Sequence, residues 1–330
     1  MKAIVRRTYG SPDVLRLEEM EKPTPAENEV LIKVCAAAVN PYDWHFVRGT
    51  PYFLRLIAGL RRPKSIRLGV DVAGQVESVG KNVSQFRPGD SVFGACNAAF
   101  AEYACVPESK LARKPDNITF EQAGSVAIAG LTALQVLRDK GHIQAGQSVL
   151  IIGASGGVGT FAVQIAKSLG AQVTGVCSTR NVEMVRSIGA DRVIDYTRED
   201  LLLGDDRYDL VAACAGNHSF FDCRRILKPQ GVYVGVGGGG PELHWMIGPI
   251  IGALATAALS AFVSQKAAGI IAKTNQADLV ALAGLMASGK LTPIIDRTYS
   301  LAQVADSLHY LEQGHARGKV VITTCDARAA

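Results

Sequence analysis

Hydrophobic and polar positions follow two different rhythms along this chain of 330 residues. From Met1 to about Lys114 the apolar residues form short runs separated by proline and glycine, most clearly at 30–34 and 70–80. From about Asn117 onward, strand-like runs alternate with stretches of helical periodicity. The first rhythm predicts a compact β domain of the barrel type, and the second predicts a parallel sheet with right-handed crossovers. We therefore expect an α/β protein with two domains.

The central feature of the second rhythm is a buried strand at 148–152, followed by a glycine-rich turn and an apolar helix at 160–167. Such a turn lets the backbone approach a phosphate, and the N–H groups and dipole at the start of the helix favour negative charge. The usual pattern has three glycines, and an alanine stands where the first is expected. The alternative is a tight strand–helix connection without a ligand. We predict a dinucleotide site, whose turn residues are Ala154, Ser155, Gly156, Gly157 and Val158.

The strand after the glycine helix ends without the acidic residue that usually binds the ribose of NAD. Ser178, Thr179 and Arg180 follow it instead. Small hydroxyls and a guanidinium can bind a 2′-phosphate through charge-assisted hydrogen bonds, so these residues favour NADPH over NADH. The alternative is an exposed loop with an incidental arginine.

The ends of the later strands supply four further candidate cofactor contacts. Tyr196 can offer its hydroxyl to the same phosphate or pack against the adenine. Cys214 lies near the cofactor or is a buried, inert thiol. Val236 and Gly237 end the last clear strand of the alternating region.

The stretch 246–263 carries no charge. We expect a helix packed in the interior or in a subunit contact, because the stretch contains a proline, glycines and many alanines. The alternatives are peripheral membrane contact and a membrane span, for which the stretch is at the short limit.

Composition fits a soluble globular enzyme, with 48% hydrophobic and 20% charged residues. The net charge of +5 is modest, and no basic run interleaved with aromatic residues is present, so we expect no nucleic-acid partner. The densest positive patch is either a solvated loop or an aid in attracting a phosphorylated cofactor. It comprises Arg55, Arg61, Arg62, Lys64 and Arg67.

Seven cysteines are scattered along the chain, and none form a C-x-x-C pair. Scattered single cysteines indicate reduced thiols and argue against a cysteine-rich structural zinc lobe. The chain enters a strand pattern directly after Met1, so we expect no signal peptide and a cytoplasmic location.

Several motifs together carry a family resemblance that covers nearly the whole chain. They lie at 38–44 (AVNPYDW), 69–74 (GVDVAG), 130–133 (GLTA), 154–159 (ASGGVG) and 314–321 (GHARGKVV). With them the chain resembles the zinc-independent quinone oxidoreductases of the medium-chain dehydrogenase/reductase superfamily, the group related to zeta-crystallin and the reticulon-interacting mitochondrial oxidoreductases.

The resemblance implies a GroES-like catalytic domain at 1–118, a Rossmann domain that binds NADPH at 119–272, and a final segment, 273–330, that returns to the first domain. It implies an active site between the domains, and a homodimer joined through the Rossmann domains. By resemblance, Asn40 and Tyr52 are the candidate catalytic residues, and Thr132 and Lys319 are expected near the cofactor.

Zinc alcohol dehydrogenases of this superfamily carry a cysteine where Asn40 stands and a histidine where Val70 stands. Asn and Val cannot replace these zinc ligands, and the nearby His45 and Asp71 lack a third convergent ligand, so we expect no metal.

Without a Lewis acid, a conjugated acceptor is the easier substrate, because its negative charge spreads over an enolate or phenolate. The expected activity is therefore NADPH-dependent reduction of quinones or α,β-unsaturated carbonyls. The alternatives are an NADPH-binding adaptor or RNA-binding redox sensor without catalysis and, less favoured, a zinc alcohol dehydrogenase.

Overall fold

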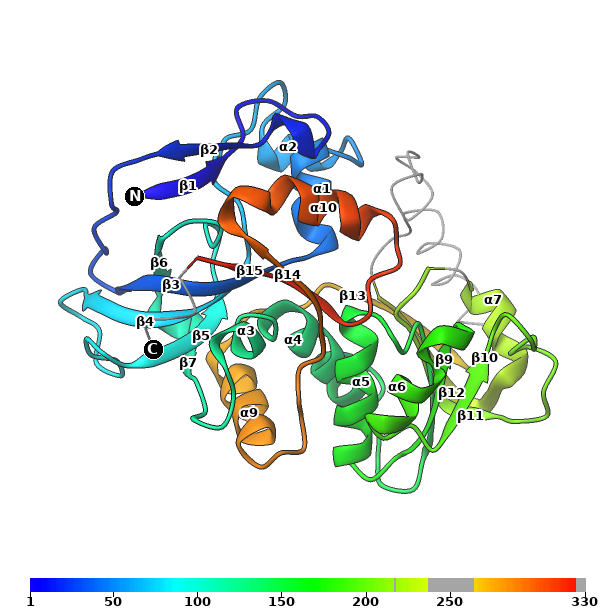
Figure 1. Cartoon of the computed structure of the whole chain (residues 1–330). Helices are drawn as coiled ribbons and strands as arrows, with labels where there is room; N and C mark the ends of the chain where they lie inside the picture. The colour runs from blue at the N-terminus through cyan, green and yellow to red at the C-terminus, as the bar shows by residue number, and fades with distance from the viewer. Residues whose placement is uncertain (217, 237–263, 325–330) are drawn as a thin grey trace. The chain divides into compact units, whose positions relative to one another are not determined.

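The computed structural model describes residues 1–216, 218–236 and 264–324 (Figure 1). Gly237 and the uncharged stretch 246–263 lie outside the described residues. The chain divides into two compact units, one formed by Met1–Ile128 with Thr274–Ala330 and the other by Ala129–Lys273. The N-terminal boundary between the two units lies after Ile128, ten residues beyond the expected boundary at 118, and it falls inside the helix Ala127–Gln135.

The first unit contains a seven-stranded sheet in the order β14-β15-β3-β4-β5-β7, with β6 paired to β3. Its neighbouring strands are antiparallel except for β14 and β15, which are parallel. A two-stranded sheet, β1 with β2, completes the β structure described for this unit. The strands are β1 (Lys2–Val5), β2 (Arg16–Glu19), β3 (Glu29–Val39), β4 (Asp71–Val79), β5 (Ser91–Ala95), β6 (Tyr103–Pro107), β7 (Leu111–Arg113), β14 (Ile295–Ser300) and β15 (Lys319–Thr323).

Short helices lie around this sheet, and apolar side chains from both faces of β3 form cores with them. Ile32, Val34, Ala37 and Val39 belong to one core, and Ala36 and Ala38 belong to another. The change from even to odd positions falls at the irregularity in the pairing with β4 between Val34 and Ala36, which shifts the alternation of the strand by one residue. The helices are α1 (Pro41–Arg48), α2 (Leu54–Ala58), α3 (Phe120–Ala123), α9 (Gln276–Ala287) and α10 (Val304–Glu312), with 3-10 turns at Pro12–Val14, Glu108–Lys110 and Leu301–Gln303.

The last described strand joins the N-terminal sheet. In Figure 1 the red β15 lies beside β3, and the two pair antiparallel with Val320 opposite Val39. Burial of the apolar run Val320–Ile322 between β3 and β14 explains this return, since the same residues alone would make an exposed apolar strand.

The second unit is a six-stranded parallel sheet in the order β10-β9-β8-β11-β12-β13. The strands are β8 (Ser148–Ile152), β9 (Gln172–Cys177), β10 (Arg192–Asp195), β11 (Tyr208–Ala213), β12 (Leu227–Val236) and β13 (Lys266–Ile270). The connecting elements are α4 (Ala127–Gln135), a π-helical turn (Val136–Lys140), α5 (Gly157–Ser168), α6 (Val182–Ser187) and α7 (Phe220–Cys223), with 3-10 turns at Thr179–Asn181 and Arg224–Ile226.

The order of these strands reverses direction between β8 and β11. In open parallel sheets a ligand binds beyond the carboxyl ends of the strands at such a switch point. The glycine turn follows β8 directly, so the fold places the predicted phosphate-binding residues at the expected position. The predicted α/β architecture, a barrel-type sheet and a doubly wound parallel sheet, is confirmed.

Candidate active site

The glycine turn between β8 and α5 has open space where a phosphate is expected. A Cβ added to Gly159 would lie 2.1 Å from the Gly153 carbonyl oxygen, so Gly159 is required for α5 to pack against the end of β8. A Cβ added to Gly156 would meet nothing closer than 3.5 Å. Since Gly156 is the N-cap of α5, the unpaired N–H groups of the first helical turn lie beside this open space.

Gly153 is a turn residue that the sequence analysis missed. Its φ of +79° lies in the left-handed region, which favours glycine, and an added Cβ would lie 2.9 Å from the Cβ of Ala215. The signal was present, because Gly153 follows the last apolar residue of the strand. The tight turn therefore depends on Gly153 rather than on a glycine at the position of Ala154.

Asn181, also missed from the sequence, joins the glycine turn to the end of β9. Its side-chain amide nitrogen donates to the hydroxyl oxygens of Ser155 and Ser178, each at 3.1 Å. Because both hydroxyls accept from Asn181, their own protons are left to donate to a ligand. The buried Oδ1 of Asn181 has no hydrogen-bond partner among the described residues, so it can accept from a ribose hydroxyl. This donor and acceptor set fits a phosphorylated dinucleotide.

Thr179 is less available to a phosphate than its position in the sequence suggests. Its hydroxyl donates to Asp195 Oδ2 at 2.6 Å and lies 2.7 Å from the hydroxyl of Thr197. The hydrogen bond from Thr179 lowers the pKa of Asp195, so this carboxylate stays charged at neutral pH. Arg180 follows Thr179 in the same 3-10 turn, and the half-exposed ring of Tyr196 follows Asp195. Ser178, Arg180 and Tyr196 thus remain the candidate phosphate ligands.

Cys214 and Val236 lie at the ends of β11 and β12. The Cys214 N–H donates to the carbonyl oxygen of Ile152 at 2.9 Å, which ties the end of β11 to β8. Burial raises the pKa of the Cys214 thiol to about 12, so the thiol is protonated at neutral pH. Val236 pairs with Ile270 of β13. Neither residue offers a charged group to a cofactor.

In the first unit, three polar side chains that are distant in sequence form one buried cluster. Lys319 Nζ donates to Asn40 Oδ1 at 2.6 Å and to Asp71 Oδ2 at 3.0 Å. Asn40 Nδ2 donates to Asp71 Oδ2 at 3.0 Å and to the carbonyl oxygen of Ala38 at 3.2 Å. Both amide protons of Asn40 are therefore committed, and no exposed side chain belongs to this cluster, which we call the Asn40–Asp71–Lys319 cluster.

The cluster also orders the start of α4. Asp71 Oδ1 accepts from the backbone N–H of Ile128 at 2.7 Å, in the first turn of that helix. The end of β3, the start of β4, the start of β15 and the N-terminus of α4 thus meet at one carboxylate. Thr132 lies four residues further along α4 and is buried.

Asp43 is a second buried carboxyl group next to this cluster. Its Oδ2 accepts from the Asn40 backbone N–H at 2.8 Å, and its Oδ1 has no hydrogen-bond partner in the described part of the chain. Burial raises the pKa of Asp43 to about 7, and the nearby charge of Asp71 acts in the same direction. Arg6 is buried as well, and its Nε and Nη1 are likewise unpartnered among the described residues.

Tyr52 does not join the buried cluster. Its ring is 52% exposed and lies against the Arg55 guanidinium, which is 4.8 Å from the ring centroid. No hydrogen bond to its hydroxyl is found among the described residues. Tyr52 can therefore still donate, whereas Asn40 has no spare N–H.

The residues that stand where related zinc enzymes bind their metal do not form a set of zinc ligands in this chain. Val70 stands where zinc alcohol dehydrogenases of the superfamily carry a histidine. His45 Nδ1 lies 2.8 Å from the carbonyl oxygen of Thr50, and the His45 ring stacks on Trp44. Within the described ranges, no group of three or more His, Cys, Asp or Glu side chains could hold a metal ion.

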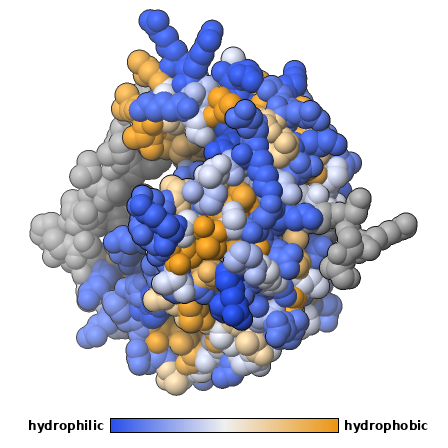
Figure 2. Space-filling view, turned by 90° about the vertical axis from the view of Figure 1, so that its left-hand side faces the viewer, coloured by the Kyte–Doolittle hydropathy of each residue, from blue (hydrophilic) through white to orange (hydrophobic). Residues whose placement is uncertain are grey.

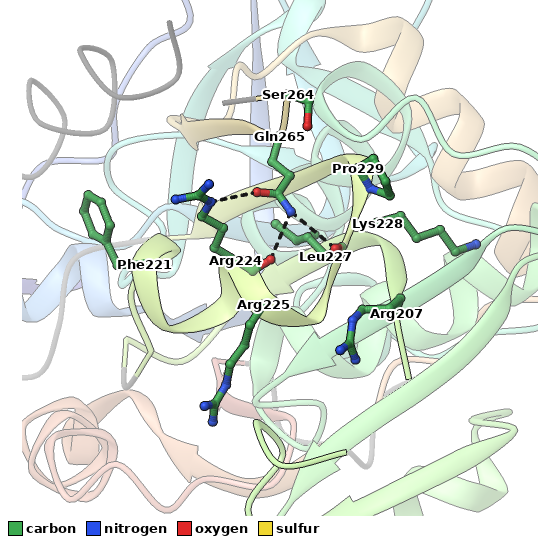
Figure 3. A pocket seen from close by; sticks show the side chains of 9 residues that line it. All are labelled: Arg207, Phe221, Arg224, Arg225, Leu227, Lys228, Pro229, Ser264 and Gln265. Carbon is green, nitrogen blue, oxygen red and sulfur yellow. Dashed lines mark hydrogen bonds between the residues drawn. The ribbon is translucent and has the colours of Figure 1, made fainter. Parts of the chain in front are cut away.

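A pocket of about 670 Å³ lies elsewhere on the second unit and shares no residue with the predicted cofactor set (Figure 3). Gln265 lies at its centre, accepting from Arg224 and donating to the carbonyl oxygens of Arg224 and Leu227. Its lining also includes Arg207, Phe221, Arg225, Lys228, Pro229 and Ser264. The pocket belongs to the start of β12, not to the carboxyl edge of the sheet.

A strand-rich unit joined to a doubly wound unit, with an open glycine turn at the switch point, defines a dinucleotide-dependent dehydrogenase or reductase. The family model described as "Alcohol dehydrogenase GroES-like domain" matches residues 26–116, and the one described as "Zinc-binding dehydrogenase" matches residues 188–322. No helix among the described residues is long and apolar enough to cross a membrane.

Three known proteins illustrate the similarity. The chloroplastic NADPH-dependent alkenal/one oxidoreductase of Arabidopsis thaliana is 34% identical over 98% of this chain and 79% of its own. The quinone oxidoreductase structure from Coxiella burnetii matches with a TM-score of 0.84 and 32% identity, covering 98% of this chain and 99% of that one. The Escherichia coli quinone oxidoreductase complexed with NADPH matches with a TM-score of 0.82 and 26% identity, covering 98% and 100%. The chain belongs to the quinone oxidoreductase family of the medium-chain dehydrogenase/reductase superfamily.

Proposed function

We propose that this protein is an NADPH-dependent reductase that transfers a hydride to quinones or α,β-unsaturated carbonyl compounds without a zinc ion. The observation that carries the proposal is the Asn40–Asp71–Lys319 cluster, in which an ammonium group bonds to Asn40, the residue that stands where zinc enzymes of the superfamily carry a cysteine ligand. The relatives named as alkenal/one and quinone oxidoreductases support the substrate class.

NADPH fits the residues at the carboxyl edge of the parallel sheet. Ser155 and the first turn of α5 would hold its pyrophosphate, while Ser178, Arg180 and Tyr196 would hold the 2′-phosphate. When bound, NADPH supplies the hydride. No acidic side chain follows β9 directly to accept from a 2′-hydroxyl, which favours the phosphorylated cofactor.

The acceptor must be one whose reduction does not need a Lewis acid. A dication would have to lie beside the buried Lys319 ammonium, and neither Asn40 nor Val70 is a good zinc ligand. The charge that develops on a quinone or enone is delocalised, so hydrogen-bond donors are enough to stabilise it. Tyr52 is the candidate donor whose hydroxyl has no other partner in the described part of the chain, and water can supply the final proton.

Turnover and metal content test this proposal together. The purified protein should oxidise NADPH with saturable kinetics in the presence of 9,10-phenanthrenequinone or a small enone, and dialysis against a chelator should not change the rate. NADPH binding without turnover would instead favour an adaptor or redox sensor. Stoichiometric zinc whose removal abolishes turnover would identify a zinc dehydrogenase and contradict the proposal.

The proposal includes a homodimer in the cytoplasm. The dimer rests on the family resemblance alone. The location is supported by six free cysteines among the described residues, since a reducing compartment keeps such thiols unpaired. Light scattering of the purified protein and localisation of a tagged chain test these two points.

A further inference from the structure

Large apolar side chains gather on the surface around α2. Twelve large hydrophobic residues are exposed among the described residues, and five of these lie within residues 52–60. Leu56 is 72% exposed, Ile57 and Leu60 are each 67% exposed, and Phe53 is 40% exposed. We call these four residues the apolar patch. Such clustering marks an interaction surface more often than scattered apolar residues do.

The spacing of the apolar patch is that of one helix face. Leu56, Ile57 and Leu60 follow Phe53 by three, four and seven positions. This pattern normally marks the side of a helix that faces a protein core. In the structure only Leu54–Ala58 is helical, with Phe53 as the N-cap, and Gly59 has a φ of +119°, so Leu60 lies beyond the helix. All four side chains of the patch are exposed to solvent.

The surrounding structure holds the apolar patch in this exposed position. The Tyr9 hydroxyl donates to the carbonyl oxygen of Gly59 at 2.6 Å, and the Lys64 N–H donates to that of Ala58 at 2.7 Å. Arg55 Nε donates to the carbonyl oxygen of Gly49 at 2.9 Å, and its guanidinium lies 4.5 Å from the ring centroid of Tyr9. The exposure therefore results from a defined set of contacts.

The chain segment that carries the apolar patch contains positive charges only. Residues 44–70 contain six arginines and lysines and no aspartate or glutamate. Arg48 pairs with Glu312, and Arg55 bonds to backbone oxygens. Arg61, Arg62 and Lys64 are exposed, and they make no ion pair or side-chain hydrogen bond with any described residue. We call these three the basic group. Figure 2 shows hydrophobic side chains beside projecting hydrophilic ones at the top of the molecule, the level of α2 in Figure 1.

We propose that the apolar patch and the basic group together dock the protein on an anionic lipid bilayer. Phe, Leu and Ile side chains enter the boundary between headgroups and acyl chains, and arginine and lysine reach lipid phosphates with their long side chains. A symmetric contact with a second copy is disfavoured, because it would bring two basic groups together without any acidic partner. Docking through this loop would bring Tyr52, which immediately precedes the patch, to the bilayer surface. If the proposed function holds, the acceptors include quinones dissolved in the membrane.

Vesicle flotation of the full-length protein tests the docking surface. We expect binding to phosphatidylcholine vesicles that contain phosphatidylglycerol and little binding to phosphatidylcholine alone. The double variant Leu56→Gln/Ile57→Gln and the triple variant Arg61→Gln/Arg62→Gln/Lys64→Gln should each lower the partition coefficient about tenfold or more.

Two matched variants serve as controls on surfaces outside the patch. Leu203→Gln/Ile271→Gln removes two apolar side chains that are at least as exposed as Leu56 and Ile57. Arg207→Gln/Arg225→Gln/Lys290→Gln removes two exposed arginines and an exposed lysine. Both should bind vesicles like the parent protein. Thermal unfolding should show that all four variants are folded, because every substituted side chain is exposed.

The proposal is overturned if the parent protein does not float with anionic vesicles, or if both patch variants float as it does. A patch variant that changes the oligomeric state without changing flotation would assign the surface to a second copy. Reductase assays separate this proposal from the proposed function. The double variant should lose activity on a long-chain quinone in anionic vesicles and keep it on a water-soluble quinone. Flotation without reduction of any quinone would leave the docking surface standing and reject the reductase.

Discussion

The ammonium group of Lys319 lies 2.6 Å from the side-chain oxygen of Asn40, and the two residues are 279 positions apart in the chain. Lys319 also pairs with Asp71, and all three side chains are buried. A buried ion pair contributes little net stability, because the cost of desolvating both charges offsets their attraction. Removing the Lys319 ammonium alone would leave Asp71 as an uncompensated buried charge. The cluster therefore makes the return of the C-terminal segment to the first sheet electrostatically specific.

Replacement of Lys319 by methionine should destabilise the first unit strongly. The substitution keeps the length of the side chain and removes the charge, so the free energy of unfolding should fall by about 3–5 kcal/mol. Urea unfolding followed by circular dichroism measures the change. Lys81→Met is the matched control, because the ion pair of Lys81 with Glu27 is exposed, and it should change the stability by less than about 1 kcal/mol.

Asp43 should make the stability of the protein fall as the pH rises toward neutrality. Its folded-state pKa of about 7 lies above the unfolded value of 3.8, so the folded state binds the extra proton between these two values. Asp43→Asn removes this titration while keeping an acceptor for the Asn40 N–H. Relative to the parent, the variant should therefore gain stability between pH 4.5 and pH 7, on the order of 2 kcal/mol. Parallel pH profiles of unfolding for the two proteins would contradict this assignment.

Gly156, the N-cap of α5, and Gly159, in the first turn of α5, should respond differently to replacement by alanine. Gly159→Ala places a methyl group 2.1 Å from a carbonyl oxygen, so the protein should lose about 2–4 kcal/mol of stability. Gly156→Ala meets no close atom and should keep the melting temperature, but its methyl group occupies the space expected for the pyrophosphate. Thermal unfolding and fluorescence titration with NADPH separate the two outcomes. Equal NADPH affinity in Gly156→Ala and the parent would place the pyrophosphate elsewhere.

Arg180→Ala should weaken NADPH binding about tenfold and leave NADH binding nearly unchanged, because the proposed charge-assisted bond is to the 2′-phosphate, which NADH lacks. Calorimetric titration with both cofactors measures the ratio. Arg198→Ala is the control, since Arg198 is exposed and lies 3.6 Å from Asp195. If both variants lose NADPH affinity equally, the effect is one of general surface charge.

Tyr52→Phe should lower kcat for quinone reduction about tenfold or more if its free hydroxyl donates to the acceptor oxygen. Asn40→Ala should act mainly on stability, because both amide protons of Asn40 are already bonded within the cluster. Initial rates at saturating NADPH, with unfolding curves for each variant, provide the comparison. Unchanged turnover in both variants would remove these two side chains from the catalytic site.

The local sequence pattern was sufficient to predict the structural elements that depend only on residues close together in the chain. The alternation of apolar strands and helices after about Asn117 predicted the parallel sheet, because a strand and the helix after it are encoded within a few tens of residues. The glycine turn was recognised for the same reason. Even there, the positive φ of Gly153 and the bridging role of Asn181 became visible only in the folded turn.

The amino-acid sequence by itself determined the fold class, the phosphate-binding turn and the absence of an acidic residue directly after β9, because each depends on residues close together in the chain. Only the tertiary structure decided that Asn40, Asp71 and Lys319 share one buried cluster, that Thr179 bonds to Asp195, and that the apolar side chains of Phe53, Leu56, Ile57 and Leu60 are exposed to solvent. The spacing of hydrophobic residues shows which side chains would share an apolar face. Whether that face is buried depends on contacts between segments that are distant in the chain. The same physical limit holds for a buried charge, whose partner is selected by the packing of the sheet and not by its neighbours in the chain.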